Sequence, residues 1–382
     1  MLPPTCFSTA TNSMIYLHIP FCHRKCTYCA FYSVVAAGDR QAYVDALCKE
    51  LAMRRHEAGH PVRTVYFGGG TPSVLSVGQL GQIVDALAAH YDIGAVEEVT
   101  LEANPEDLTP EYLHALAALG FFNRISIGVQ SFSDSDLKML NRRHSALQAV
   151  EAVHNAFDEG FDNISVDLIY GLPHSDTEQW RENLRQVEQL PVSHLSAYAL
   201  TIEPGTILAK QVESGRIVTV GEEEVLRQYG ALCMWAGEHG FEQYEISNFC
   251  RPGCKARHNS RYWDRTPYLG VGAAAHSFDG EYRRWNVADV KQYVESVAAG
   301  HIAHEEEQLG LKDAHNEYLM TALRTVEGIA KDRVMQPFAA RLAKEVQKFV
   351  DAGWVEETPT HYRPTAEGLL HADGMAAELF IN

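Results

Sequence analysis

Strand-like and helix-like segments alternate along most of this chain, and the alternation limits the folds it can adopt. From residue 14 to residue 200, six runs rich in Val, Ile and Leu are each followed by a segment with helical character. Such repeats build parallel sheets, because a parallel connection needs a crossover that is usually a helix. The strand-like runs are apolar on both faces, as strands covered by helices require. We therefore predict the α/β class.

Six strand–helix units fall short of the eight that close a barrel. We expect a partial, laterally open (βα)6 barrel over residues 14–250, with a doubly wound open sheet as the alternative. Residues 1–13 then form an N-terminal extension and residues 251–288 a linker segment. Residues 289–382 show helical stretches and a short hairpin, which predict a smaller C-terminal domain, helical and winged-helix-like.

Composition narrows the function classes. The 382 residues carry 32 Lys and Arg against 50 Asp and Glu, a net charge of −18, which disfavours nucleic acid as a partner. The C-terminal segment lacks a basic stripe, so a docking or lid role is favoured there over DNA binding. No apolar run approaches the roughly 20 residues of a membrane span, and the N-terminus does not resemble a secretory signal. We expect a cytoplasmic protein with reduced thiols.

Three cysteines crowd into eight residues directly after the first predicted strand. Cys22, Cys26 and Cys29 follow the pattern C-x3-C-x2-C. A [4Fe–4S] cluster normally takes four thiolates, so three ligands leave one iron open to a small molecule. Zinc, with His18 or His23 as the fourth ligand, is the alternative.

This motif resembles the signature of the radical S-adenosylmethionine (SAM) superfamily, and the preceding YLHIPFC resembles its coproporphyrinogen dehydrogenase branch and the HemW-type heme chaperones. The resemblance covers nearly the whole chain and implies a [4Fe–4S] cluster held by the three cysteines, with SAM bound beside it. Several positions match the SAM-binding residues of the family: Tyr16, Tyr28, Gly69, Gly70, Thr71, Glu102, Gln130, Arg142 and Asp167. Independently, the carboxyl ends of barrel strands are where ligands bind, and an arginine there can hold a carboxylate.

Two sequence features distinguish the heme chaperones from the dehydrogenases. The dehydrogenases continue C-x3-C-x2-C-x-C, whereas Phe31 stands at the fourth cysteine position, as in the chaperones. The segment Arg257–Trp263 (RHNSRYW) resembles the H-N-x-x-Y-W heme motif of the chaperones, which makes His258 a candidate heme ligand, with Arg257 or Arg261 facing propionates. The resemblance implies a heme chaperone that passes heme to respiratory hemoproteins, with an electron donor as a further partner. Oxygen-independent coproporphyrinogen III dehydrogenase, an enzyme of porphyrin biosynthesis, is the alternative.

Overall fold

Six parallel strands form the centre of the molecule, as the sequence predicts. The computed structural model describes residues 13–35, 40–59 and 61–381, so the predicted N-terminal extension lies almost wholly outside the described residues. The strands pair in chain order, each parallel to the next. They are β1 (Ser13–Ile19), β4 (Val62–Gly69), β5 (Glu98–Ala103), β6 (Arg124–Gln130), β7 (Ile164–Tyr170) and β8 (His194–Ala199).

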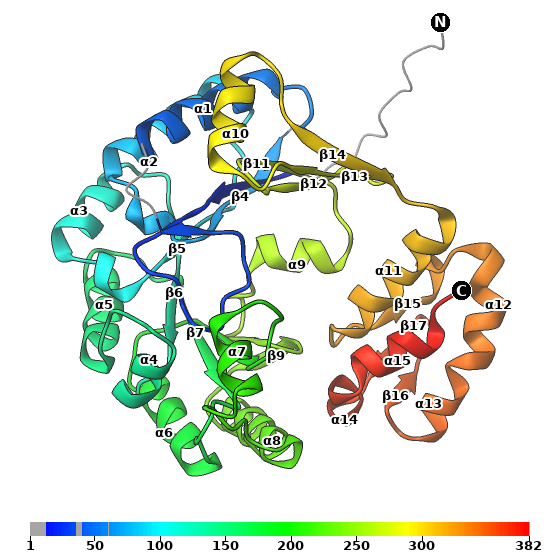
Figure 1. Cartoon of the computed structure of the whole chain (residues 1–382). Coiled ribbons are helices and arrows are strands. Elements are labelled where there is room, and N and C mark those ends of the chain that lie inside the picture. The colour runs from blue at the N-terminus through cyan, green and yellow to red at the C-terminus, as the bar shows by residue number, and fades with distance from the viewer. Residues whose placement is uncertain (1–12, 36–39, 60, 382) are drawn as a thin grey trace, which may run out of the picture.

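Helices cover the outer face of these strands (Figure 1). Side-chain caps define where several helices begin; Ser76 and Ser145, for example, each form a capping box with a glutamine three residues later. One continuous apolar core fills the space between helices and strands. The helices are α1 (Arg40–Met53), α2 (Val77–His90), α3 (Pro110–Ala118), α4 (Asp134–Met139), α5 (Ala146–Asp158), α6 (Thr177–Glu188) and α8 (Glu222–Glu238), with short 3-10 turns at Pro72–Val74 and Pro105–Asp107.

The sheet does not close into a barrel. Beyond β8 it continues antiparallel through β10 (Asn248–Cys250) to β9 (Glu242–Glu245). On the other side β11 (Tyr268–Val271) adds parallel to β1, and three antiparallel strands follow: β12 (His276–Phe278), β13 (Tyr282–Asn286) and β14 (His304–Gln308). Because β14 and β9 are the two free ends of the strand order, the expected lateral opening is confirmed.

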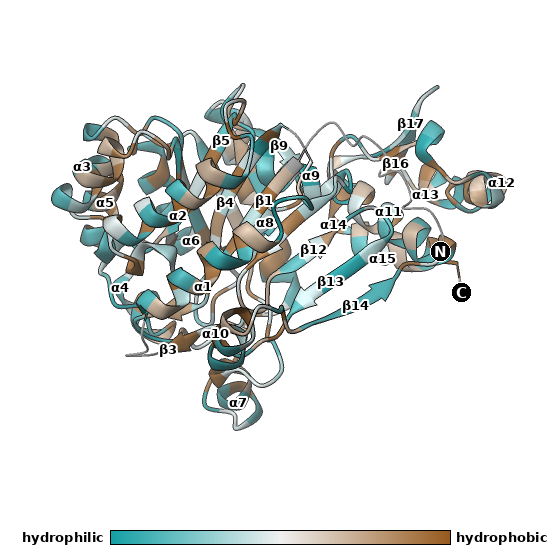
Figure 2. Cartoon of the chain, turned by 90° about the horizontal axis from the view of Figure 1, so that it is seen from above, coloured by the Kyte–Doolittle hydropathy of each residue, from teal (hydrophilic) through white to brown (hydrophobic). Residues whose placement is uncertain are grey.

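The strands β12–β14 were not expected from the sequence. Residues 282–308 continue the sheet, and α10 (Val290–Ala298) packs on α1, so the predicted division at residue 288 falls inside this extension. The RHNSRYW segment, expected as a loop, is the short helix α9 (Arg257–Trp263). Figure 2 shows β13 and β14 as hydrophilic strands beside the apolar centre of the sheet.

A second apolar core begins in α11 (Leu311–Leu323) and belongs to the C-terminal unit. The expected hairpin is present as β16 (Val355–Glu357) and β17 (His361–Pro364), with β15 (Ile329–Ala330) completing a small sheet. The expected helical stretches are present as short segments on both sides of the hairpin. The segments are α12 (Gln336–Glu345), α13 (Gln347–Asp351), α14 (Ala366–Leu370) and α15 (Ala372–Leu379). Within the described ranges no helix has the length and apolar character to cross a membrane.

Candidate functional site: the mouth of the open barrel

The cysteine loop lies at the carboxyl end of β1, between the short strands β2 (Phe21–Cys22) and β3 (Val34–Val35). Thr27 fixes the middle of this loop. Its backbone N–H donates to the Leu140 carbonyl (3.1 Å) and its hydroxyl to the Met139 carbonyl (3.2 Å), at the end of α4. Its own carbonyl accepts from Leu208 (2.8 Å) in α7 (Ile207–Glu213). The loop is therefore held between two helices.

Two of the three thiols receive hydrogen bonds from predicted site residues. The Thr71 hydroxyl donates to Cys22 Sγ, and Arg142 Nη1 donates to Cys26 Sγ, each at 3.4 Å. Burial raises the pKa of Cys22 and of Cys29. In the described part of the chain, no three His, Cys, Asp or Glu side chains converge on one metal position. A cube binds each thiolate at a different iron, so its ligands need no such convergence.

The glycine segment after β4 fits tightly against the start of this loop. Gly69 has a φ of +112°, and a Cβ there would lie 2.6 Å from the His18 ring. At Gly70 a Cβ would lie 2.8 Å from the Phe21 carbonyl oxygen. Only glycine permits this approach. The His18 ring is fixed by Tyr16 Oη, 3.0 Å from Nδ1, and by the Tyr32 carbonyl, 3.1 Å from Nε2. His18 thus packs behind the site, and burial lowers its pKa to about 4.

Two carboxylates, Glu102 on β5 and Asp167 on β7, add acceptor groups to this site. Glu102 accepts from the Tyr66 hydroxyl (2.7 Å) and from the Gly69 backbone N–H (3.1 Å). Burial raises the pKa of Glu102 to about 7, and the two hydrogen bonds only partly offset this effect. Asp167 accepts from the Ser126 hydroxyl at 3.3 Å, and burial raises its pKa as well. The pair offers hydrogen-bond acceptors to a polar ligand at the mouth.

Arg142 joins the cysteine loop to the strand ends. It donates to the Gly128 carbonyl (2.6 Å) and to Asn104 Oδ1 (2.7 Å), in addition to Cys26. Asn104 in turn donates to Thr71 (3.3 Å). Sequence reasoning missed Asn104, although its place two residues after Glu102, past the end of β5, was an available signal.

Gln130 has a φ of +71° at an irregularity in the β6–β7 pairing. A non-glycine residue in this region is strained, and such strain gathers at ligand sites. Tyr16 lies beside Tyr66, with ring centroids 6.1 Å apart, and Tyr28 packs on the apolar cluster of Leu140, Ile169 and Leu172. The structure therefore brings the predicted SAM-binding residues and the cysteines to one end of the sheet.

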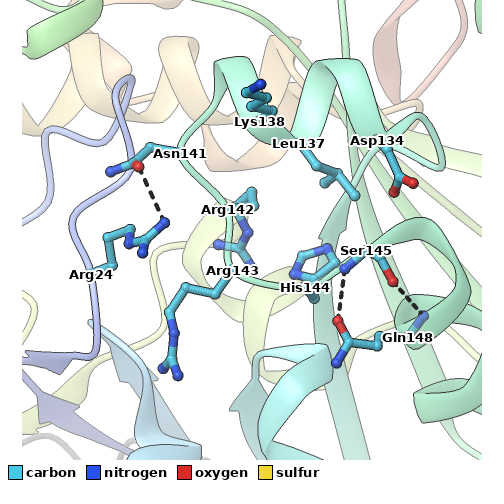
Figure 3. Close-up of a pocket in the computed structure, with 10 residues that line it drawn as sticks. All are labelled: Arg24, Asp134, Leu137, Lys138, Asn141, Arg142, Arg143, His144, Ser145 and Gln148. Atoms are coloured by element: carbon cyan, nitrogen blue, oxygen red, sulfur yellow. Dashed lines mark hydrogen bonds between the residues drawn. The ribbon is translucent and has the colours of Figure 1, made fainter.

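A pocket of about 300 Å³ opens beside the cysteine loop (Figure 3). Its walls come from the loop and from the segment linking α4 to α5. Arg24 reaches across to Asn141 Oδ1 at 3.5 Å, and Lys138, Arg142 and Arg143 add further positive charge. On a chain with a net charge of −18, this is a local basic rim next to Cys26.

His258 lies on α9 beneath β4, and its ring centroid is 5.0 Å from that of Tyr66, the residue that donates to Glu102. Its side chain is fully buried, with Nδ1 2.9 Å from Thr64 Oγ1 and Nε2 3.0 Å from Tyr262 Oη. Glu98 accepts from the backbone N–H of His258 and of Arg257, each at 2.8 Å. Burial lowers the pKa of His258 to about 3. Both ring nitrogens are therefore engaged inside the protein, and neither faces solvent.

The arginines of the same motif are more accessible. Arg257 and Arg261, which the sequence offered as partners of propionates, line a surface pocket of about 390 Å³ together with Lys255. Arg257 is also paired with Glu97 at 2.7 Å. The motif thus combines a buried histidine with two arginines that reach the protein surface.

Comparisons with known proteins agree with this geometry. The Radical SAM superfamily profile matches residues 16–187, and the HemN C-terminal domain profile matches residues 309–371. The structure resembles the Escherichia coli coproporphyrinogen III oxidase HemN, described as a radical SAM enzyme, with a TM-score of 0.83 and 25% identity over 96% of this chain and 90% of that one. The cysteine loop on an open parallel barrel thus defines a radical SAM protein.

Sequence relatives narrow the family. The chain is 36% identical over 326 residues to the heme chaperone HemW of Mycobacterium tuberculosis, covering 84% of this chain and 83% of the relative. It is 34% identical over 330 residues to the heme chaperone HemW of Lactococcus lactis, covering 86% of each chain. The chain belongs to the HemW family of radical SAM proteins.

Proposed function

We propose that this protein is a heme chaperone that holds a [4Fe–4S] cluster and SAM at the barrel mouth and passes heme to hemoproteins, respiratory enzymes among them. Cys22, Cys26 and Cys29 supply three thiolates, and Cys22 and Cys26 receive hydrogen bonds from Thr71 and Arg142. Such a cluster leaves one iron open, where the amino and carboxylate groups of SAM can bind.

The SAM-binding residues have the chemistry that this ligand requires. Arg142 supplies a guanidinium for the carboxylate, and the Gly69–Thr71 segment exposes backbone groups for the amine. Glu102 and Asp167 accept hydrogen bonds from hydroxyl or ammonium groups. The basic rim around Arg24 and the adjoining pocket suits an acidic electron donor, because opposite charges attract it to the side of the cluster loop.

Phe31 is the observation that favours the chaperone over the dehydrogenase. It replaces the fourth cysteine of the dehydrogenase pattern, and a phenyl ring can neither ligate metal nor transfer hydrogen as a thiol does. Its side chain is 73% exposed at the end of the cysteine loop. The resemblance of the fold to HemN supports the oxidase only at the level of architecture.

If His258 ligates heme iron, as predicted, one of its ring nitrogens must first lose its present partner. Both ring nitrogens already have partners 2.9 and 3.0 Å away, so ligation of iron there requires α9 to separate from β4. Arg257 is exposed and Arg261 partly exposed, so neither needs such a movement to pair with a propionate.

Two assays on anaerobically reconstituted protein test the proposal. In the first, protein loaded with one equivalent of heme is mixed with a heme-free b-type cytochrome, and transfer is followed by absorbance. The chaperone function predicts saturable heme binding and recovery of the holo-cytochrome spectrum. Absence of stoichiometric binding or of transfer contradicts it.

The second assay supplies coproporphyrinogen III, SAM and a reductant, and separates porphyrins by chromatography. We expect no sustained conversion to the divinyl product. Phe31→Cys serves as a matched variant, since it restores the dehydrogenase pattern without changing other loop contacts. Sustained turnover by the unaltered chain would establish the oxidase alternative instead.

A further inference from the structure

One strand connects the predicted heme ligand with the predicted SAM site. Thr64 and Tyr66 lie on the same side of β4, since side chains two residues apart along a strand point the same way. Thr64 Oγ1 is 2.9 Å from His258 Nδ1, and the rings of Tyr66 and His258 have centroids 5.0 Å apart with 31° between their planes. The strand ends at Gly69, where the predicted SAM-binding segment begins. In Figure 1, α9 lies between β4 and α11, in contact with both.

Tyr66 is the side chain that contacts both sites. Its hydroxyl donates to Glu102 Oε1 (2.7 Å), while the Gly69 backbone N–H donates to Glu102 Oε2 (3.1 Å). The Tyr66 side chain is buried, and a Cβ at residue 68 would lie 2.7 Å from its ring, so only glycine leaves room for the ring in this position. The ring is therefore held between the backbone of its own strand, the carboxylate of Glu102 and the imidazole of His258.

The two sites place opposite demands on Tyr66. Ligation of iron by His258 requires α9 to separate from β4, and this movement removes the imidazole from the Tyr66 ring. A ring that has lost this neighbour can turn away and give up the hydrogen bond that fixes Glu102. SAM at the mouth, by contrast, is held best when Glu102 and Gly69 keep their present positions. Because a ligand shifts an equilibrium toward the state that it binds better, SAM favours the docked state of α9.

We propose that Tyr66 is a positioning residue shared by both sites, through which SAM keeps α9 docked and heme ligation by His258 weakens the binding of SAM. This inference rests on the proposed heme-chaperone function. Coupling between two sites is reciprocal, so each ligand lowers the affinity for the other by the same factor. The chain then takes up heme more readily when the SAM site is empty than when it is filled.

Amide hydrogen exchange of α9, followed by mass spectrometry, tests the effect of SAM without heme. The protein is the full, anaerobically reconstituted chain, kept without reductant so that SAM stays intact. The backbone N–H groups of Arg257 and His258 donate to Glu98 at 2.8 Å each, so they exchange when α9 leaves its place. Saturating SAM should slow the exchange of this peptide severalfold. An unchanged or faster exchange overturns the proposal.

Heme titrations with and without saturating SAM test the reciprocal effect. SAM should lower the heme affinity of wild type by roughly fivefold or more. Tyr66→Phe keeps the ring but lacks the hydroxyl, so the effect of SAM should disappear from both experiments when this variant is saturated with SAM. Tyr91→Phe is the matched control, because it removes another buried hydroxyl, bonded to the Leu51 carbonyl at 2.9 Å, and should keep the full effect.

Three results of the titrations contradict the proposal. They are an equal heme affinity of wild type with and without SAM, a higher affinity with SAM, and an undiminished effect of SAM in Tyr66→Phe. Circular dichroism checks that this variant folds, and the wild-type measurements decide the sign of the coupling without it. If the wild-type chain binds no heme, the proposed function fails, whereas the amide exchange of α9 still decides whether SAM holds this helix.

Discussion

In the absence of cluster and SAM, the Glu102→Gln variant should be more stable than wild type at alkaline pH and less stable than wild type at acidic pH. Burial raises the pKa of this carboxyl from 4.5 to about 7. Between these values the folded state keeps a proton that the unfolded state has released. Stability therefore falls as pH rises through this window, and the loss is complete above about 7.

The size of this effect follows from the same shift. A raise of this size corresponds to roughly 3 kcal/mol, reduced somewhat because part of the Glu102 side chain remains exposed. The amide of the Glu102→Gln variant can keep the hydrogen bond from Tyr66 but loses an acceptor for the Gly69 N–H, which costs about 1 kcal/mol. We expect the variant to be about 1 kcal/mol less stable near pH 4.5 and about 2 kcal/mol more stable near pH 8.

The measurement is urea unfolding of both proteins at several pH values, followed by tryptophan fluorescence. Glu151→Gln, on the exposed side of α5, controls for the loss of one formal charge. The pH dependence of the difference is decisive, because the lost hydrogen bond contributes equally at every pH. A difference that is constant with pH, or that shifts in favour of wild type as pH rises, would refute the reasoning. SAM binding by wild type should also weaken below pH 7.

Three further changes test the site. Gly69→Ala should lower the free energy of unfolding by roughly 2 kcal/mol or more and abolish SAM binding. Gly160 also has a positive φ but open space around it, so Gly160→Ala should lower the free energy of unfolding only by the cost of backbone strain. Equal losses in unfolding experiments would contradict this. Cys26→Ser should lose iron and sulfide after reconstitution while Cys233→Ser keeps both; retained metal in the first variant would remove Cys26 from the ligand set. Thr64→Val should lower the unfolding free energy by roughly 1–3 kcal/mol, because it leaves a buried imidazole nitrogen unpaired; an unchanged midpoint would be inconsistent with that contact.

Regular, strongly patterned elements could be predicted from the sequence. Apolar periodicity and a capping residue mark the helices at Val77–His90 and Thr177–Glu188, so both can be placed from the sequence. The strands β13 and β14 could not be predicted in this way. The side chains of β14 are all exposed and those of β13 mostly partly so, which leaves little apolar alternation. These segments are strands because β13 pairs with β12 and β14 pairs with β13.

Some features of the candidate site could likewise be predicted from the sequence, and others could not. Residues at strand ends could be identified one by one, because parallel strands bring their carboxyl ends to one edge. Their connections could not, since the hydrogen bonds from Arg142 through Asn104 to Thr71 depend on loop conformation. The environment of His258 was also hidden, because sequence spacing does not show that Thr64 and Tyr262 occupy both ring nitrogens.

The lateral opening lets the sheet continue beyond β1, on the side away from the strands that carry the predicted SAM-binding residues. In a closed barrel, β1 would pair with β8, and the strands flanking the cluster loop would be enclosed. Here β11 adds to β1, and the chain then turns back at Gly272, whose φ is +108°. This reversal places β12–β14 outside the circle of the barrel. One side of β1 thus borders β4 and the other strands that carry predicted SAM-binding residues, and its other side borders β11.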